Sequence, residues 1–156
     1  MVTVKEKQQV TLKLAGECVS HSRTDVAVRD LRTTIDEPAA RGGTNLGPSP
    51  TETLIAALIG CTNVIAHKVA TKNNVGLQAM SVRVEAEFDR RGVTLEKEIE
   101  VPFPELTLHI DITTDAGDAA IETLKRELAM FCPLSKIIRN SGTRLSEVWT
   151  VSRPTA

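Results

Sequence analysis

The stretch that most constrains this chain runs from residue 41 to residue 72, where a loop rich in glycine and proline leads into one long apolar segment. Ser49 can cap the free amides of a first helical turn, Pro50 suits the first helical position, and Glu52 completes a Ser-x-x-Glu capping box. Residues 73–76, Asn-Asn-Val-Gly, supply stop signals. The pattern predicts a helix that begins at Pro50 and ends close to residue 72.

Most of the circumference of this predicted helix is apolar. One stripe is formed by Leu54, Leu58, Cys61 and Ile65, and much of the rest by Ile55, Ile59, Ala66 and Val69. A helix that is apolar on most sides is usually buried on most sides. Polar residues between Thr62 and Lys68 interrupt the apolar run well short of the roughly 20 residues that a membrane span needs. We therefore expect no membrane partner, and we expect Cys61 to lie inside a core.

Length and charge limit the remaining possibilities. A chain of 156 residues is long enough for one domain with a real core, and no internal repeat or low-complexity linker divides it. We expect a single domain over residues 1–156. The formal net charge is -1, and lysine and arginine are scattered among the acids rather than gathered in a basic stripe. No nucleic-acid partner is expected.

The N-terminus and the cysteines bear on the compartment. Residues 1–14, MVTVKEKQQVTLKL, contain no long apolar core and no small-residue cleavage site, so we expect no secretion signal and a cytoplasmic location. In a reducing compartment, three cysteines argue against a structural disulfide framework, and any disulfide would be transient and catalytic. The three histidines are irregularly spaced and no Cys-x-x-Cys pair exists, so no metal is expected.

The rest of the chain reads as strands and helices. Alternating apolar and polar residues predict strands in four regions, namely residues 9–35 (as antiparallel strands), 80–88, 106–114 and 144–152. Residues 36–50 contain three prolines and three glycines and predict a loop. Asp115 is the expected cap of a helix with an apolar face, and Pro133 the first residue of a short second helix that Gly142 ends. The predicted class is α+β, with helices packed on a mostly antiparallel sheet.

Two cysteines sit in contrasting predicted environments. Cys132 directly precedes Pro133 at a helix N-terminus, where free amides and the macrodipole favour an anion and lower a thiol pKa. Cys61 lies in the middle of an apolar helix, where burial raises the pKa unless a cation such as Arg41 is supplied. Taken alone, Cys61 is most often a small core residue and Glu52 only a capping residue. Helix-end electrostatics alone would make Cys132 the attacking thiol.

The segment GGTNLGPSPTETLIAALIGC, followed some seventy residues later by FCPLSKII, resembles the OsmC/Ohr family of thiol peroxidases over nearly the whole chain. The resemblance implies the OsmC-like α+β fold, with mostly antiparallel sheets packed on a long central helix in an intertwined dimer. It also implies that Cys61 is the peroxidatic cysteine, Cys132 the resolving cysteine and Glu52 the acidic partner of an activating arginine. OsmC-type members place that arginine in the loop before the helix, which fits Arg41. Ohr-type members place it nearer the N-terminus, which would point to Arg23.

The implied activity is a cysteine-based peroxidase that reduces organic hydroperoxides and, more weakly, hydrogen peroxide. The Cys61 thiolate would become a sulfenic acid, condense with Cys132 to a disulfide, and be recycled by an external small or lipoyl-type dithiol without a cofactor. The chain has no tyrosine and few aromatics, so a pocket for an organic peroxide would be mainly aliphatic. Cys18 has no counterpart in the motif and is expected to be a bystander.

Two other functions stay open. One is a non-enzymatic OsmC-fold protein that is stress-associated or binds a small molecule, although such a protein has no chemical need for the full set of Arg41, Glu52, Cys61 and Cys132. The other, a thiol-disulfide oxidoreductase acting on proteins, is weaker because no Cys-x-x-Cys is present.

Helix geometry adds an expectation about assembly. Glu52 and Cys61 are nine residues apart, which places them about 13 Å apart along one helix axis and on opposite faces. The simpler arrangement brings Arg41 and Glu52 of one subunit to Cys61 of the other. We therefore expect an obligate homodimer with two sites at its interface.

Overall fold

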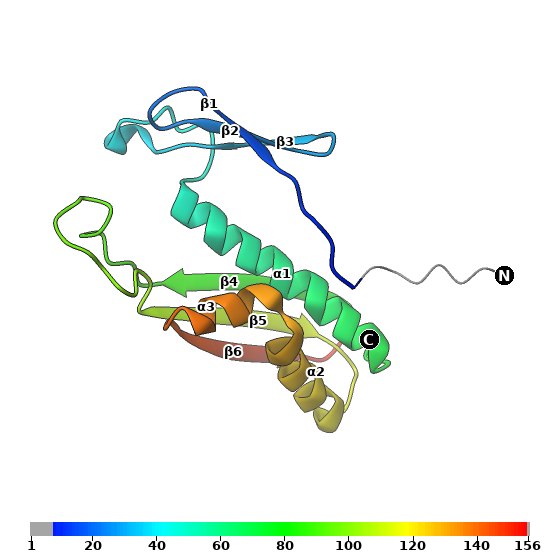
Figure 1. Ribbon diagram of the computed structural model, residues 1–156. Helices are drawn as coiled ribbons and strands as arrows, with labels where there is room; N and C mark the ends of the chain where they lie inside the picture. The colour runs from blue at the N-terminus through cyan, green and yellow to red at the C-terminus, as the bar shows by residue number, and fades with distance from the viewer. Residues whose placement is uncertain (1–7, 156) are drawn as a thin grey trace. The chain divides into compact units, whose positions relative to one another are not determined.

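The computed structural model describes residues 8–155, and its elements follow the predicted order of strands, one long helix, strands, helices and a strand (Figure 1). The elements are β1 (Ala15–Cys18), β2 (Thr24–Val28), β3 (Leu31–Ile35), the 3-10 turn η1 (Ala39–Arg41), α1 (Pro50–Lys72), β4 (Ala79–Ala86), β5 (Glu105–Thr113), α2 (Asp118–Phe131), α3 (Pro133–Asn140) and β6 (Arg144–Ser152). The first seven residues of the stretch examined for a secretion signal lie outside the described residues.

The chain divides into two compact units, Met1–Leu54 and Ile55–Ala156, with the boundary near the start of α1. The single domain expected over residues 1–156 stays a prediction.

The first unit holds an antiparallel sheet in the order β1-β2-β3. The strand predicted from the alternation of Val10, Leu12 and Leu14 is wrong in position, because β1 begins only at Ala15 and those three side chains are exposed. The cause lies in the partner strand: Ala15 pairs with Ala27, and β2 ends one residue later at a tight turn. Only Val28 of β2 lies beyond this pair, so the segment before Ala15 has almost no partner strand.

The second unit holds a sheet in the order β4-β5-β6. β4 and β5 are antiparallel, with Val82 opposite Ile110, as their alternation predicts. β6 runs parallel to β5, which the expectation of a mostly antiparallel sheet did not include. The chain reaches β6 through α2 and α3, and a crossover of this kind is what parallel neighbours require.

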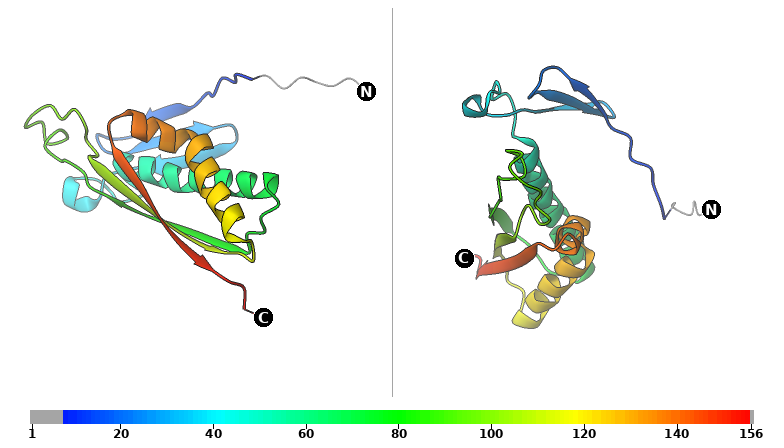
Figure 2. Two further views of the ribbon diagram at one scale, coloured as in Figure 1. Left: turned by 90° about the horizontal axis from the view of Figure 1, so that it is seen from below. Right: turned by 60° about the vertical axis from the view of Figure 1, so that its left-hand side comes forward.

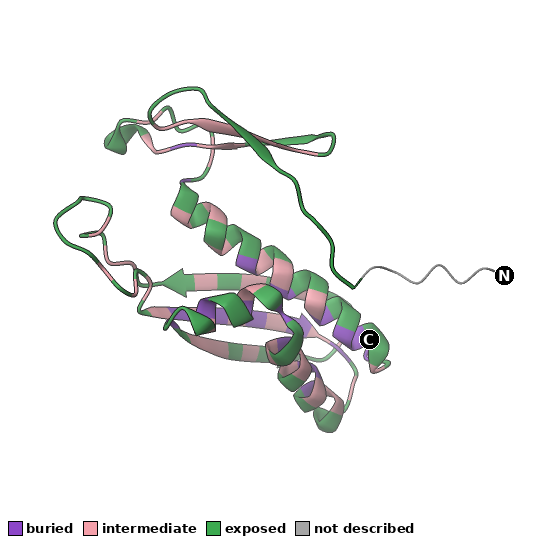
Figure 3. Ribbon diagram, viewed as in Figure 1, coloured by how far each residue is buried: buried purple, intermediate pink, exposed green. Residues whose placement is uncertain are grey.

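The core of the second unit lies between this sheet and its helices (Figures 2 and 3). Every second residue of β5 is buried, which puts its apolar side chains on one face of the sheet. The helices cover that face with apolar side chains: Leu58, Ala66, Val69 and Ala70 from α1, Leu124 and Leu128 from α2, and Ile138 from α3. Cys132 belongs to the same buried cluster.

Both ends of α1 are where the sequence predicts them, since the helix begins at Pro50 and ends at Lys72. Asn74 follows with a positive φ of 55°. The predicted start of α3 at Pro133 is likewise confirmed. The predicted cap of α2 at Asp115 is wrong, because the N-cap is Gly117 and the helix begins at Asp118.

Only part of α1 is covered within one chain. Of its most apolar 18-residue window, 28% is buried, and Val64 is 50% exposed. The expectation of burial on most sides is therefore not met within the second unit, because its sheet covers one helix face. By length and mean hydropathy α1 could cross a membrane despite its polar residues, but the core helix of a soluble protein meets the same test.

Candidate functional site

The two sequence-predicted cysteines meet in the second unit. Cys61 lies in α1, and Cys132 is the junction residue that ends α2 and caps α3. Their Sγ atoms are 3.4 Å apart although the residues are 71 positions apart in the sequence. Cys132 is fully buried, whereas Cys61 is only partly buried. The structure therefore places two free thiols in contact, one of them closer to solvent.

The Cys-Pro dipeptide explains how Cys132 reaches this position. A residue before proline is disfavoured in the helical region, and Cys132 adopts an extended backbone with φ -68° and ψ 109°. α2 therefore stops at Phe131, and Pro133 begins α3 in a new direction. The thiol at this break faces α1, where Cys61 stands between the buried residues Leu58 and Thr62.

Opposing effects act on the Cys61 thiol. Burial raises its pKa, and the neighbouring Cys132 acts in the same direction, first through its hydrogen bond with Cys61 and then through charge repulsion. The backbone amide of Leu134 acts in the opposite direction by hydrogen bonding to the Cys61 sulfur. The net direction is upward. No cationic side chain of residues 55–155 is among the groups that shift this pKa.

The backbone amide of Leu134 is part of the candidate site, and the sequence did not predict it. The Cys-Pro signal correctly marks a helix N-terminus, but the sequence assigned its free amides to Cys132 alone. In the structure an amide from the first turn of α3 hydrogen-bonds to Cys61 and contributes to lowering its pKa. Which thiol faces the amide depends on how α3 packs, and no local spacing in the sequence fixes that.

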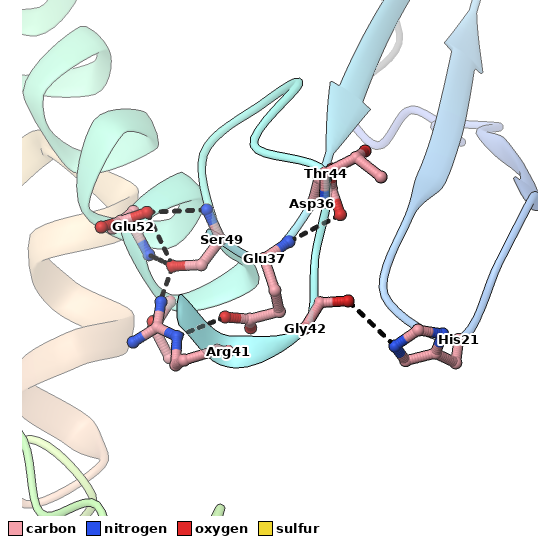
Figure 4. Close-up of polar contacts among 9 residues, drawn as sticks. His21, Asp36, Glu37, Arg41, Gly42, Thr44, Ser49 and Glu52 are labelled. Atoms are coloured by element: carbon pink, nitrogen blue, oxygen red, sulfur yellow. Dashed lines mark hydrogen bonds and ion pairs between the residues drawn. The ribbon is translucent and has the colours of Figure 1, made fainter. Parts of the chain in front are cut away.

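The other two predicted site residues lie in the first unit, around the loop before α1 (Figure 4). Arg41 ends the turn η1, and its Nε donates to Oε2 of Glu37 at 2.6 Å. The direct ion-pair partner of Arg41 is therefore Glu37 rather than the expected Glu52. The charge of Arg41 nevertheless contributes to lowering the pKa of Glu52, so the two side chains act on each other.

Glu52 forms the predicted capping box. Its Oε2 accepts hydrogen bonds from the amide and the hydroxyl of Ser49 at 2.7 and 2.8 Å, and its own amide donates to the Ser49 hydroxyl at 3.4 Å. The Ser49 amide and then the Ser49 hydroxyl are the main groups that lower the Glu52 pKa, ahead of Arg41. Glu52 is therefore an anion at neutral pH.

The alternative arginine has a different setting. Arg23 makes a two-pronged contact with Asp25, at 3.1 Å from Nε and 2.7 Å from a terminal nitrogen. Asp25 also accepts a hydrogen bond from the Thr34 hydroxyl at 2.8 Å. These bonds hold Arg23 against the first sheet, whereas Arg41 lies on the loop. Cys18 is an exposed free thiol on β1.

A groove of about 280 Å³ lies in the second unit. It is lined by Ile65, Lys68, Val69, Lys72 and Phe131. Ile65 lies one helical turn beyond Cys61, and Phe131 directly precedes Cys132. The groove is mainly apolar but not wholly aliphatic, because the aromatic ring of Phe131 lines it. Lys72 Nζ lies 5.4 Å from the centre of that ring. Across residues 8–155, no three His, Cys, Asp or Glu side chains gather as metal ligands.

The fold and the thiol pair together define an α+β protein in which a long core helix and a broken helix bring two free cysteines into contact. The chain belongs to the OsmC-like protein family, whose profile matches residues 43–146. This confirms the family resemblance. A comparison with curated protein sequences gave no significant match.

Solved structures of the same fold cover nearly the whole chain. An OsmC-like protein from Mycoplasma pneumoniae is 14% identical with a TM-score of 0.74, and the match covers 95% of this chain and 100% of the other. An organic hydroperoxide resistance protein OsmC from Legionella pneumophila is 21% identical with a TM-score of 0.65, covering 94% and 99%. The organic hydroperoxide resistance protein OhrB of Bacillus subtilis is 19% identical with a TM-score of 0.59, covering 90% and 98%. These likenesses confirm the predicted OsmC-like fold.

Proposed function

We propose that this protein is a cysteine-based peroxidase that reduces organic hydroperoxides, with Cys61 as the attacking thiol and Cys132 as the resolving thiol. The observation that carries the proposal is the 3.4 Å contact between their Sγ atoms. Two thiols that already touch can form a disulfide with little movement of the backbone. Family membership and the likeness to proteins named for organic hydroperoxide resistance support the same activity.

Exposure favours Cys61 as the thiol that attacks. A peroxide must reach the sulfur, and Cys132 is fully buried while Cys61 is partly exposed. The Leu134 amide stabilises charge on Cys61. The exposure of Cys61 outweighs the expectation from helix-end electrostatics alone, which would have selected Cys132, and it agrees with the role that the family resemblance implies.

The proposed reaction is a two-electron reduction in two sulfur steps. The Cys61 thiolate attacks the distal peroxide oxygen, the O–O bond breaks, and the departing alkoxide takes a proton to leave as an alcohol. Cys61 is then a sulfenic acid, and Cys132 attacks its sulfur and displaces water to form the disulfide. An external small or lipoyl-type dithiol reduces the disulfide by exchange through a mixed disulfide, in a reducing cytoplasm.

The thiolate requires a cation from outside the second unit, because burial disfavours its charge and no cation of residues 55–155 offsets this effect. We assign this role to Arg41, which pairs directly with Glu37 and interacts with Glu52 through its charge. In this account, two copies of the chain form the working protein, and the loop of one copy supplies Arg41 to Cys61 of the other.

The apolar groove of the second unit suits the organic part of a hydroperoxide. Ile65, Val69 and Phe131 offer apolar surface next to the positions of both cysteines in the sequence. An alkyl or aryl group bound there would be removed from water. Hydrogen peroxide gains nothing from such a surface, so the proposal ranks organic hydroperoxides above it.

A turnover assay with tert-butyl hydroperoxide, cumene hydroperoxide and hydrogen peroxide, each with dihydrolipoamide or another small dithiol, tests the proposal. We expect turnover with both organic substrates and slower turnover with hydrogen peroxide. Cys61→Ser should be inactive, and Cys18→Ser should match the native chain. No turnover with any pairing of peroxide and reductant would instead support a non-enzymatic, small-molecule-binding protein of this fold.

A further inference from the structure

Asp36 is a charged residue without access to solvent, placed where β3 ends and the loop to α1 begins. Its carboxylate accepts hydrogen bonds from the amides of Glu37 at 2.8 Å and Leu46 at 3.2 Å, and from the amide and hydroxyl of Thr44 at 3.0 and 2.5 Å. The Thr44 hydroxyl contributes most to holding the Asp36 pKa well below its ordinary value. Asp36 is therefore an anion at neutral pH, bonded to both ends of the loop.

The loop between these donors is tightly folded. The Asn45 amide donates to the Glu37 carbonyl at 3.1 Å, and the Asp36 amide donates to the Pro48 carbonyl at 3.0 Å. A Cβ atom added to Gly43 would lie 1.8 Å from the Glu37 carbonyl oxygen, so only glycine fits there. The carboxylate of Asp36 is thus the centre of a closed loop with little freedom to shift.

Arg41 is connected to this centre through Glu37. The Glu37 amide is bound by Asp36, and the Glu37 side chain binds Nε of Arg41 at 2.6 Å (Figure 4). The Arg41 amide also donates to the Pro38 carbonyl at 2.8 Å. Both the backbone and the side chain of the arginine are therefore set by the loop that Asp36 closes.

Within residues 8–54, no salt bridge joins Asp36 to a basic side chain, although the negative charge of Asp36 contributes to raising the pKa of Arg23. Outside the loop, the Ser22 hydroxyl also contributes to lowering the Asp36 pKa. Burying a carboxylate is costly unless its hydrogen bonds compensate. Here four hydrogen bonds to the carboxylate come from the loop that carries Arg41. A neutral residue would leave these donors poorly satisfied, and so the loop conformation depends on this one charge.

We propose that Asp36 is a positioning residue, which fixes the loop so that Arg41 can stabilise the Cys61 thiolate. This inference rests on the proposed function for its choice of Arg41 as the activating cation. Asp36 itself touches neither the peroxide nor the thiols. Asp36 acts on the Cys61 thiolate through Arg41. A change at Asp36 should therefore have no further effect on the thiolate once Arg41 is replaced.

The test follows the pH titration of the Cys61 thiolate by its ultraviolet absorbance, in a Cys18→Ser, Cys132→Ser background where Cys61 is the sole thiol. We compare Asp36→Asn, Thr44→Val, Arg41→Ala and the double variant Asp36→Asn/Arg41→Ala. Asp25→Asn is the matched control, because Asp25 is another hydrogen-bonded carboxylate of the first unit and its partners are Arg23 and Thr34. Thermal unfolding of each variant verifies folding, and the rate of thiol oxidation by tert-butyl hydroperoxide is followed in parallel.

We expect Asp36→Asn to raise the titration midpoint of Cys61 towards that of Arg41→Ala, with Thr44→Val giving a smaller shift in the same direction. The oxidation rate should fall by about 10- to 100-fold, as for other small displacements of a positioned group. In the Arg41→Ala background, Asp36→Asn should change the rate by less than about twofold, since residues acting through one another are not additive. Asp25→Asn should titrate like the native chain.

Three outcomes overturn the inference. A folded Asp36→Asn variant that titrates like the native chain would show that the loop does not need the charge. An equal loss of rate with and without Arg41 would reduce Asp36 to a structural residue. A shift in Asp25→Asn alone would move the role to Arg23. If Asp36→Asn does not fold, Thr44→Val decides, because it removes one donor and keeps the carboxylate. Failure of the peroxidase proposal would appear separately, as a native chain that titrates but does not react with peroxide.

Discussion

At the scale of single residues, several effects act in opposite directions on the pKa of the Cys61 thiol. Burial disfavours its thiolate, one backbone amide favours it, and the cation has to be supplied from the first unit of a chain. An opposite charge within a few ångströms typically lowers a pKa by about 1–3 units. Such a shift is large enough to decide whether Cys61 reacts at neutral pH.

The choice between the two arginines gives a first prediction. Arg41→Ala should raise the Cys61 pKa by roughly one unit, because the thiolate loses its neighbouring cation. Peroxide reduction should slow by at least about tenfold, since less of Cys61 is then ionised. Arg23→Ala should leave both properties close to native, since Arg23 is engaged by Asp25. Stopped-flow oxidation across a pH series measures both. A slow Arg23→Ala beside a normal Arg41→Ala would reverse the assignment.

Glu52 gives a prediction about pH and stability. Its folded pKa is lowered below the ordinary 4.5, so its charge stabilises the start of α1 above that pH, and the benefit is lost as the pH falls below it. Glu52→Gln should therefore unfold at a lower temperature than the native chain at neutral pH. Because the side chain is exposed, the difference should be smaller than the roughly 1 kcal/mol of a typical helix cap.

Thermal melts of both proteins across an acidic pH series test this. The two unfolding temperatures should converge as the pH drops below 4.5. A gap that stays constant or widens in acid would mean that the charge of Glu52 does not stabilise the capping box.

At the scale of elements, core packing of α1 yields another prediction. Leu58 is fully buried against the sheet of the second unit, and Leu58→Ala should destabilise the protein by about 2–5 kcal/mol through a lost contact and a cavity. Thr123 on α2 is outside the buried cluster and its hydroxyl forms only an exposed hydrogen bond, so Thr123→Ala should stay within about 0.5 kcal/mol. Chemical denaturation measures both. A small effect of Leu58→Ala would show that α1 is not the core helix.

Elements set by local signals were predictable from the sequence, and those set by long-range packing were not. Capping chemistry placed Pro50 and Pro133 at helix starts, and alternation placed β4, β5 and β6. The same alternation misplaced β1, because an alternating segment becomes a strand only where a partner strand is long enough to pair with it. The parallel direction of β6 depends on the path of two helices, which no short window reveals.

The candidate site divides in the same way. The Cys61–Cys132 contact was available only from the family resemblance, since spacing over 71 positions carries no geometric information. Glu37 as the ion-pair partner of Arg41 could have been proposed from the four-residue separation within a turn. The role of the Leu134 amide could not have been proposed from the sequence. Almost every residue has an amide, and the direction in which this one points follows from how α3 packs.

At the scale of the whole molecule, assembly is the open expectation. The second unit leaves much of α1 uncovered, with Val64 half exposed, and the proposed cation lies in a different unit from the thiols. Both features are accounted for if two chains pack together and each supplies Arg41 and Glu52 to the other. An apolar helix face left open by its own sheet is a natural surface for a second copy.

Mixed subunits test that arrangement. Arg41→Ala and Cys61→Ser homodimers should each be inactive, whereas co-refolding the two variants should restore one working site per heterodimer. Differently tagged subunits allow heterodimers to be purified before peroxide consumption is measured. A confirmed heterodimer without activity would show that each site is built from one chain. A chain that sediments as a monomer would remove the shared site altogether.

The central claim is that an organic hydroperoxide oxidises Cys61 and that Cys132 then resolves it. Intact-mass spectrometry after one equivalent of tert-butyl hydroperoxide tests this most directly, in the native chain, Cys61→Ser and Cys132→Ser. We predict that the native chain loses two hydrogens as the disulfide forms, that Cys132→Ser gains one oxygen on Cys61, and that Cys61→Ser is unchanged. An oxygen on Cys132 in Cys61→Ser, with Cys132→Ser unreacted, would reverse the two roles. A native chain that keeps its reduced mass would contradict the account.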